Sequence, residues 1–186
     1  MIDGELPEIK MILLGETGVG KTAIIKRYYY DKFDMHYTPT DSMNFIQKDL
    51  NINNQKVKLN IWDTIGQEKY RSLSKMFLNE TKIVILVYSI NDPHSFEELN
   101  YWKNLYKEQL GEDVILGVAA NKIDLIYEQK VSEESGKEFA KQNKAIFSSL
   151  SAKENRVGIE EFINNLVKEY LYSKKKKINI EDFEIS

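Results

Sequence analysis

The sequence predicts an α/β fold, in which helices wrap a mostly parallel sheet. Apolar runs recur along the 186 residues, and segments of helical periodicity lie between most of them. Ile83 to Val87 and Val114 to Ala120 are almost entirely apolar, as expected for strands that are covered on both faces. The composition, 42% hydrophobic and 30% charged, is typical of one globular domain with a sizeable core.

The first half of the chain begins with a strand and a helix and continues as a hairpin. The strand is predicted at Ile9 to Leu14, and the helix at Ala23 to Tyr30. Two further strands are predicted at Met43 to Leu50 and at Val57 to Trp62. The Asn53-Asn54 pair between them tolerates positive φ, so we expect an antiparallel pair at one edge of the parallel sheet.

The second half alternates strands with helices. Asp92-Pro93 marks a helix start, because proline is favoured in the first turn. Beyond the last helix, Ser173 to Ser186 contains four consecutive lysines followed by acids; we expect a flexible lysine-rich tail there, and one domain over residues 1–172. The predicted strands are Ile83 to Ser89, Val114 to Ala120 and Ala145 to Leu150, and the predicted helices are Ser95 to Leu110, Ser132 to Gln142 and Gly158 to Tyr172.

Residues 15–22 read Gly-Glu-Thr-Gly-Val-Gly-Lys-Thr, a full match to G-x-x-x-x-G-K-[ST] placed between a strand and a helix. Glycines allow a tight turn that aims backbone N–H groups inward, and the following helix presents its positive N-terminus. Lys21 adds a point charge between two phosphates, and the Thr22 hydroxyl suits Mg²⁺. The pattern predicts a nucleoside phosphate without naming the base. The residues of this segment predicted to bind it are Glu16, Thr17, Gly18, Val19, Gly20, Lys21, Thr22 and Ala23.

A second motif follows the strand that ends near Trp62. Asp63 stands at the end of that strand, where a carboxylate suits a Mg²⁺ site. Gly66 can bring its N–H against a phosphate. Gln67 has a donor and an acceptor, which is what orienting a water molecule for in-line attack requires; a solvent-facing turn is the alternative for it.

Two further motifs follow apolar strands and suit a purine base. In Asn121-Lys122-Ile123-Asp124, the carboxylate can accept two N–H bonds from the edge of guanine, whereas adenine offers no matching pair of donors. In Ser151-Ala152-Lys153, the Ala152 N–H can donate to the guanine O6. A P-loop kinase or ATPase, the alternative class, would need an adenine or acceptor pocket that Asn121 to Asp124 argues against.

With these four motifs in order, residues 8–172 resemble the Ras superfamily of small GTPases, and most closely its Rab branch. The resemblance to Rabs is carried by Lys58 to Asp63, Tyr70-Arg71-Ser72 and Leu86 to Ile90. It implies a P-loop small G domain, with a six-stranded sheet and five helices, that binds GTP or GDP with Mg²⁺ and hydrolyses GTP. It also implies a guanine-nucleotide switch in vesicular membrane traffic.

The resemblance assigns roles to residues that the motifs alone leave open. It makes Gln67 and Lys21 catalytic, and it adds Thr40 of switch I to the Mg²⁺ ligands Thr22 and Asp63. Gly66 senses the γ-phosphate. The remaining implied residues are Phe33, Tyr37, Lys122, Leu125 and Lys153 at the nucleotide, and the aromatic triad Phe45, Trp62 and Phe77 on the surface that effectors contact.

Three departures from the family pattern lie near the phosphates. Thr40 is followed by Asp41-Ser42 in place of Ile-Gly, and Ile65 replaces an alanine. An inward Asp41 would repel the γ-phosphate, and an outward one would alter effector recognition. The β-branched Ile65 resists rotation of the next glycine, and the Thr17 hydroxyl crowds an incoming arginine finger. We expect intact GDP and Mg²⁺ binding, slow hydrolysis and a poorly ordered switch I. The alternative is a catalytically weak nucleotide-binding scaffold.

Partners and location follow from the same resemblance and from the composition. We expect an exchange factor, a GTPase-activating protein and effectors, with the chain a monomer. A net charge of −3 gives no general attraction to nucleic acid. No secretory signal or membrane span is predicted, so we expect a cytoplasmic protein. No cysteine is present for a lipid anchor. Three alternatives stay open: the chain is cut before its anchor, the native chain continues into a second domain, or the protein is a soluble relative of Rabs. Membrane contact would need a lipidated C-terminus or the basic tail.

Overall fold

The sheet has six strands in the order β2-β3-β1-β4-β5-β6. The structure is a computed structural model of the chain and describes residues 6–34, 44–63 and 78–184. All neighbouring strands run parallel except β2 and β3, which pair antiparallel at the edge. This confirms the α/β class and the mostly parallel sheet. The strands are β1 Glu8–Leu14, β2 Asn44–Ile52, β3 Gln55–Asp63, β4 Ile83–Ser89, β5 Ile115–Asn121 and β6 Ile146–Ser149.

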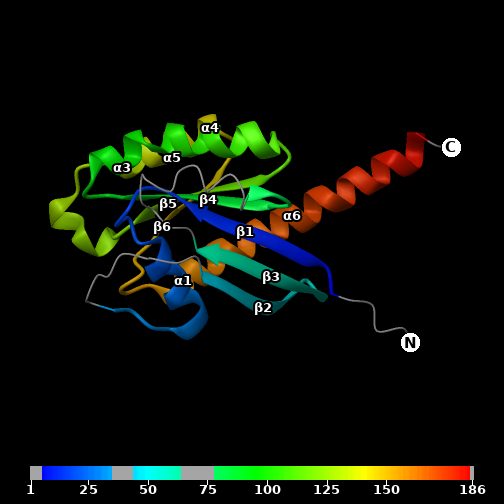
Figure 1. Cartoon of the computed structure of the whole chain (residues 1–186), viewed down its shortest axis with the longest axis horizontal. Coiled ribbons are helices and arrows are strands. Elements are labelled where there is room, and N and C mark those ends of the chain that lie inside the picture. The colour runs from blue at the N-terminus through cyan, green and yellow to red at the C-terminus, as the bar shows by residue number, and fades with distance from the viewer. Residues whose placement is uncertain (1–5, 35–43, 64–77, 185–186) are drawn as a thin grey trace.

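Helices cover both faces of the sheet (Figure 1). One face carries α1 and α6, whose buried side chains belong to one apolar cluster, and the other carries α4 and α5, which share a second cluster. A short 3-10 helix, η2 (Ile123–Glu128), follows β5. The five α-helices of the described ranges are α1 Lys21–Tyr30, α3 Pro93–Glu97, α4 Leu99–Leu110, α5 Glu133–Gln142 and α6 Arg156–Glu184.

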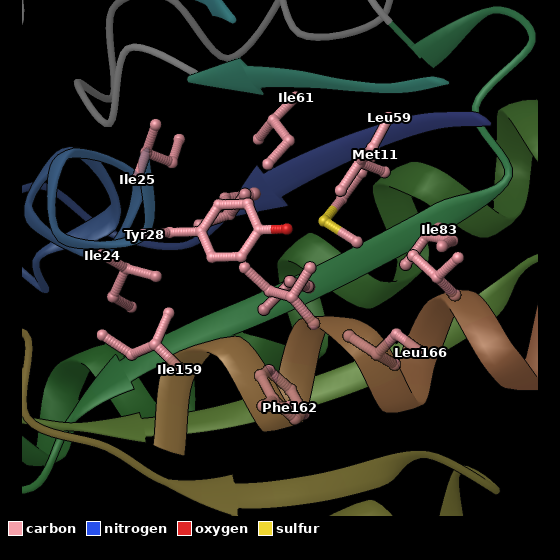
Figure 2. Packing of buried hydrophobic residues seen from close by; sticks show 14 of the residues in the cluster. Met11, Ile24, Ile25, Tyr28, Leu59, Ile61, Ile83, Ile159, Phe162 and Leu166 are labelled. Atoms are coloured by element: carbon pink, nitrogen blue, oxygen red, sulfur yellow. The ribbon is translucent and has the colours of Figure 1, made fainter. Parts of the chain in front are cut away.

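The two clusters fix the helices against the sheet. In the first, Tyr28 of α1 and Phe162 of α6 are buried with Ile61 of β3, and Figure 2 shows these side chains gathered between the elements. In the second, Trp102 of α4 lies with Tyr88 of β4. Burying each large side chain contributes about 1.5–3 kcal/mol, so the sheet and its flanking helices fold as one unit.

The hairpin forms as the asparagine pair predicts. Asn53 and Asn54 have φ of 50° and 63°, and Ile52 pairs with Gln55 across the turn. Two consecutive residues with positive φ match the right-handed twist of a two-residue hairpin, which is why Asn is favoured there. The predicted helix start at Asp92-Pro93 is also confirmed, because α3 begins at Pro93 and the Asp92 side chain accepts the His94 N–H at 3.1 Å.

Two helices differ from the sequence predictions. The segment predicted as one helix from Ser95 to Leu110 divides at Glu98 into α3 and α4, although hydrogen bonds continue across the division. Helix α6 does not end at Tyr172 but continues to Glu184. The residues after Tyr172 include no glycine or proline, and lysine and glutamate are good helix formers, so nothing in this segment stops the helix. The flexibility of this extension, and the division of the chain at residue 172, stay predictions.

Within the described ranges, none of the helices has both the length and the apolar character that crossing a membrane requires.

Candidate functional site

Three of the four predicted motifs meet at one edge of the sheet. The register pairs Leu13 of β1 with Asp63 of β3, Ser89 of β4 with Asn121 of β5, and Ala120 of β5 with Ser149 of β6. The loops that follow β1, β5 and β6 therefore leave the same, carboxyl edge of neighbouring parallel strands. Ligands of open α/β sheets bind at such an edge.

The loop after β1 is shaped by close contacts at its glycines. Gly15 has φ of 147°, and a Cβ there would overlap the backbone carbonyl of Val87. Gly20 has φ of 101°, and a Cβ there would overlap the side-chain amide of Asn121. Only glycine fits either position, so the loop lies directly against β4 and against the end of β5.

Lys21 is folded back over this loop. Its ammonium donates to the carbonyl oxygens of Gly15 at 2.7 Å and Glu16 at 2.9 Å, and the side chain is buried. Burial lowers the pKa of Lys21 to about 8, and the carboxylates of Asp63 and Glu16 act in the opposite direction. A compact cation is thus held against the loop after β1, where it suits a di- or triphosphate.

The oxygens beside Lys21 fit a magnesium ion. Asp63 is buried at the end of β3, close enough to Lys21 to affect its pKa. Thr22 stands in the first turn of α1, which has no acidic residue. A carboxylate and a hydroxyl are the hard oxygen ligands that Mg²⁺ prefers, with substrate phosphates completing the shell. Thr40, the third predicted ligand, lies outside the described residues.

Asn121 ties the loop after β1 to the loop after β6. Its Nδ2 donates to the Val19 carbonyl at 2.8 Å, and its Oδ1 accepts the Ala152 N–H at 3.3 Å. The side chain is buried, so both of its ends are used in linking two backbones. The Ala152 N–H, which the sequence predicts at the guanine O6, therefore lies at this junction.

Asp124 lies at the same junction because the chain turns sharply after β5. Lys122 has φ of 68°, and the Leu125 N–H donates back to the Lys122 carbonyl at 2.8 Å. One Asp124 oxygen accepts the Ser151 hydroxyl at 2.6 Å, and that hydroxyl in turn accepts the Glu154 N–H at 3.1 Å. These bonds orient the Asp124 carboxylate against the loop of residues 151–153.

The charge around Lys122 is balanced by nearby carboxylates. Burial lowers the pKa of Lys122, while Asp92, Asp124 and Glu128 each act to raise it. The Lys122 side chain is half-buried. Long side chains of this kind bury their methylene groups while keeping the charge hydrated.

Two sets of contacts beside the site could not be predicted from the sequence. The buried Glu16 carboxylate accepts the Trp102 indole N–H of α4 at 3.0 Å, so this side chain of the first motif contacts a helix on one face of the sheet. On the opposite face, Arg27 of α1 donates to the carbonyls of Ala152 and Lys153. These partners are 86, 125 and 126 residues apart, a separation that no local pattern reveals.

Two of the three predicted effector aromatics lie side by side. Phe45 and Trp62 face each other across β2 and β3, with ring centroids 5.1 Å apart, and Phe45 is 49% exposed. Lys10 lies over the Trp62 ring at 5.0 Å. Phe33, predicted beside the base, is half-buried and packs against the cluster that includes Tyr28.

Part of the predicted site falls outside the residues that the structure describes. It comprises the switch residues and two of the three departures near the phosphates, since Thr17 is described and exposed: the residues outside are Tyr37, Thr40, Asp41, Ser42, Ile65, Gly66, Gln67 and Phe77. Their roles stay predictions from the sequence.

The model of the Ras family matches residues 10–172, a range that begins within β1 and ends within α6.

Proposed function

The chain belongs to the Ras family of small GTPases, and from this premise we propose that it is a Rab-like switch in vesicular membrane traffic, with slow hydrolysis of GTP. Family membership carries guanine-nucleotide binding, GTP hydrolysis and dependence on Mg²⁺ in general. The Rab-like character, the traffic role and the low rate are the proposal.

The observation that supports it best is the junction made by Asn121. One buried amide holds the phosphate loop at Val19 and the loop of residues 151–153 at Ala152. Asp124 is fixed to that second loop through Ser151. The groups proposed to read the base are therefore linked by hydrogen bonds to the loop proposed to hold the phosphates, as a nucleotide site requires.

The proposed chemistry divides between the two ends of this site. Lys21, Thr22 and Asp63 hold the phosphates and the metal ion, and bound Mg²⁺ supplies charge neutralisation at the β- and γ-phosphates. Gln67 orients the attacking water. Thr40 and Gly66 sense the γ-phosphate and pass its presence to the surface formed by Phe45, Trp62 and Phe77.

This surface suggests how partners are bound. An exposed aromatic side chain on paired strands is a typical anchor for a protein partner, because large rigid rings lose little entropy on binding. We propose effectors there, together with an exchange factor and a GTPase-activating protein, acting on a monomeric, cytoplasmic protein. No arginine of the sequence stands out as a finger in cis, so acceleration is assigned to the activating protein.

The test is single-turnover hydrolysis of GTP loaded on the purified protein. We expect measurable GDP formation that needs Mg²⁺ and is slow, and faster turnover in the double variant Ile65→Ala, Asp41→Ile. Equal rates in the two proteins would place these residues on the partner surface and remove the proposed cause of slow turnover. Failure to retain GTP at all would overturn the proposal.

A second candidate is a scaffold that holds GDP or GTP without acting as a switch, either alone or as one domain of a longer protein. The observation in its favour is the set of departures Asp41, Ser42 and Ile65, which act where a switch must move. Effector binding by the GDP form and by the form with a non-hydrolysable GTP analogue separates the two. Equal affinities indicate a scaffold, because a ligand that binds both states equally shifts no equilibrium.

A further inference from the structure

Arg27 contacts the loop proposed to read the base, although it lies on α1. Its Nε donates to the Ala152 carbonyl at 2.8 Å, and one terminal nitrogen donates to the Lys153 carbonyl at 2.7 Å. The arginine side chain is 17% exposed. Two consecutive peptide carbonyls are thus held by one planar group, which fixes both the position and the tilt of that segment of backbone.

The guanidinium is itself held by a second set of charges. Its other terminal nitrogen lies 3.0 Å from the carboxylate of Asp31, the residue that caps the C-terminal end of α1. The second oxygen of Asp31 pairs with Arg156 at 3.1 Å, and Arg156 pairs with Glu160 of α6 at 3.1 Å. Arg27 therefore joins the base loop to α1 and, through the partly exposed side chains of Asp31 and Arg156, to α6.

We propose that Arg27 is a positioning residue for base recognition: it holds the backbone next to Ala152, so that the Ala152 N–H, which donates to Asn121 Oδ1 here, can also donate to the 6-position carbonyl of guanine. The inference rests on the proposed function and adds a residue to the binding of guanine. The Ala152 N–H is 3.3 Å from Asn121 Oδ1, a long hydrogen bond that by itself fixes the direction of this N–H only weakly. The two bonds from Arg27 to the adjoining carbonyls supply the missing restraint.

A lysine cannot replace this arrangement. It keeps the charge, but its ammonium has no fixed fork and is more strongly hydrated, so it would not hold two neighbouring carbonyls at set angles. Arg27→Lys is therefore the informative variant, since it removes geometry and preserves charge. Lys26→Ala is the matched control: Lys26 is the adjacent residue on α1, and its ion pair with Asp34, at 3.6 Å, is on the surface.

The experiment compares the unaltered protein with Arg27→Lys, each with two nucleotides, and uses Lys26→Ala as a control. Dissociation constants are measured for GDP and for 6-thioguanosine diphosphate, which keeps the N1–H, the exocyclic amine and the phosphates but has sulfur, a weaker hydrogen-bond acceptor, in place of the 6-position oxygen. We expect Arg27→Lys to weaken GDP binding by about 10-fold, the size of one well-made hydrogen bond, and to change analogue binding by less than about 2-fold. Lys26→Ala should change neither.

The outcomes separate the inference from the proposed function. An equal loss for both nucleotides would mean that Arg27 only stabilises the fold, and unchanged GDP binding in Arg27→Lys would mean that it restrains nothing of use; either result overturns the inference. If the unaltered protein does not bind GDP, the proposed function itself fails. The inference about Arg27 is supported by one result only: Arg27→Lys weakens the binding of GDP and leaves the binding of the analogue nearly unchanged.

Discussion

At the scale of single residues, the proposed selectivity for guanine depends mainly on the Asp124 carboxylate. It is oriented by the Ser151 hydroxyl at 2.6 Å. In Asp124→Asn, an amide N–H₂ would face the guanine amine, so we expect GDP affinity to fall by about 100-fold or more. Xanthosine diphosphate has a carbonyl in place of that amine and should bind the variant better than GDP does. Titration calorimetry with both nucleotides measures this reversal.

A second residue-scale prediction concerns a buried hydroxyl outside the site. Tyr88 of β4 is fully buried, its hydroxyl has no hydrogen-bond partner, and burial raises the pKa of this phenol. Such a group costs about 1–3 kcal/mol. Tyr88→Phe should therefore leave the free energy of unfolding unchanged or raise it by up to about 1 kcal/mol. Tyr88→Leu, which also removes the ring contact with Phe96, should lower it; urea denaturation distinguishes these outcomes.

At the scale of elements, the β2–β3 turn depends on side chains that accept positive φ. A β-branched residue at Asn54 would be forced into the left-handed region, at a cost of about 1–2 kcal/mol. We expect Asn54→Val to lower the melting temperature, and Asn54→Gly to leave it nearly unchanged. Gln55→Val, one residue along in extended backbone, is the control. A normal melting temperature in Asn54→Val would contradict the turn described here.

The free energy of unfolding should depend on pH through Asp31, whose ion pairs link α1 to α6. Hydrogen bonds from Arg27 and Arg156 hold the pKa of the Asp31 carboxyl below its ordinary value. A lowered carboxyl pKa stabilises the fold above the ordinary pKa near 4, and this stabilisation is lost as pH falls through the lower folded value. Asp31→Asn should therefore be less stable than the parent protein at pH 7, with the difference shrinking below about pH 4. A constant difference would show that ionisation of Asp31 is not involved.

At the scale of the whole molecule, the apolar core of the described residues ends before the C-terminal part of α6. Among the side chains described up to residue 176, Leu171 is the last that is buried, and Lys174 to Lys176 are exposed. Figure 1 shows this part of α6 extending past the sheet. Removing residues 173–186 should shift the melting temperature by less than about 2 °C, because the described side chains of this segment, residues 173–176, bury little apolar area. A large decrease would mean that the extension packs against the domain.

Much of the fold could be predicted because it depends on local patterns. The alternation of strands and helices, the hairpin at Asn53-Asn54 and the helix start at Pro93 each follow from neighbouring residues. The end of α6 could not be predicted this way, since amphipathic periodicity marks where a helix is buried and not where it stops.

The sequence by itself determined the family and three of the motifs that meet at the carboxyl edge of the sheet. Two kinds of residue have their type and spacing set by their contacts. They are the glycines that must lie against other backbone and the polar residues at the ends of apolar strands. Only the tertiary structure decided that Arg27 holds the Ala152 and Lys153 carbonyls and that Trp102 holds Glu16. The physical reason is that these hydrogen bonds join elements far apart in the chain, and the partner of each donor is set by how helices pack on the sheet.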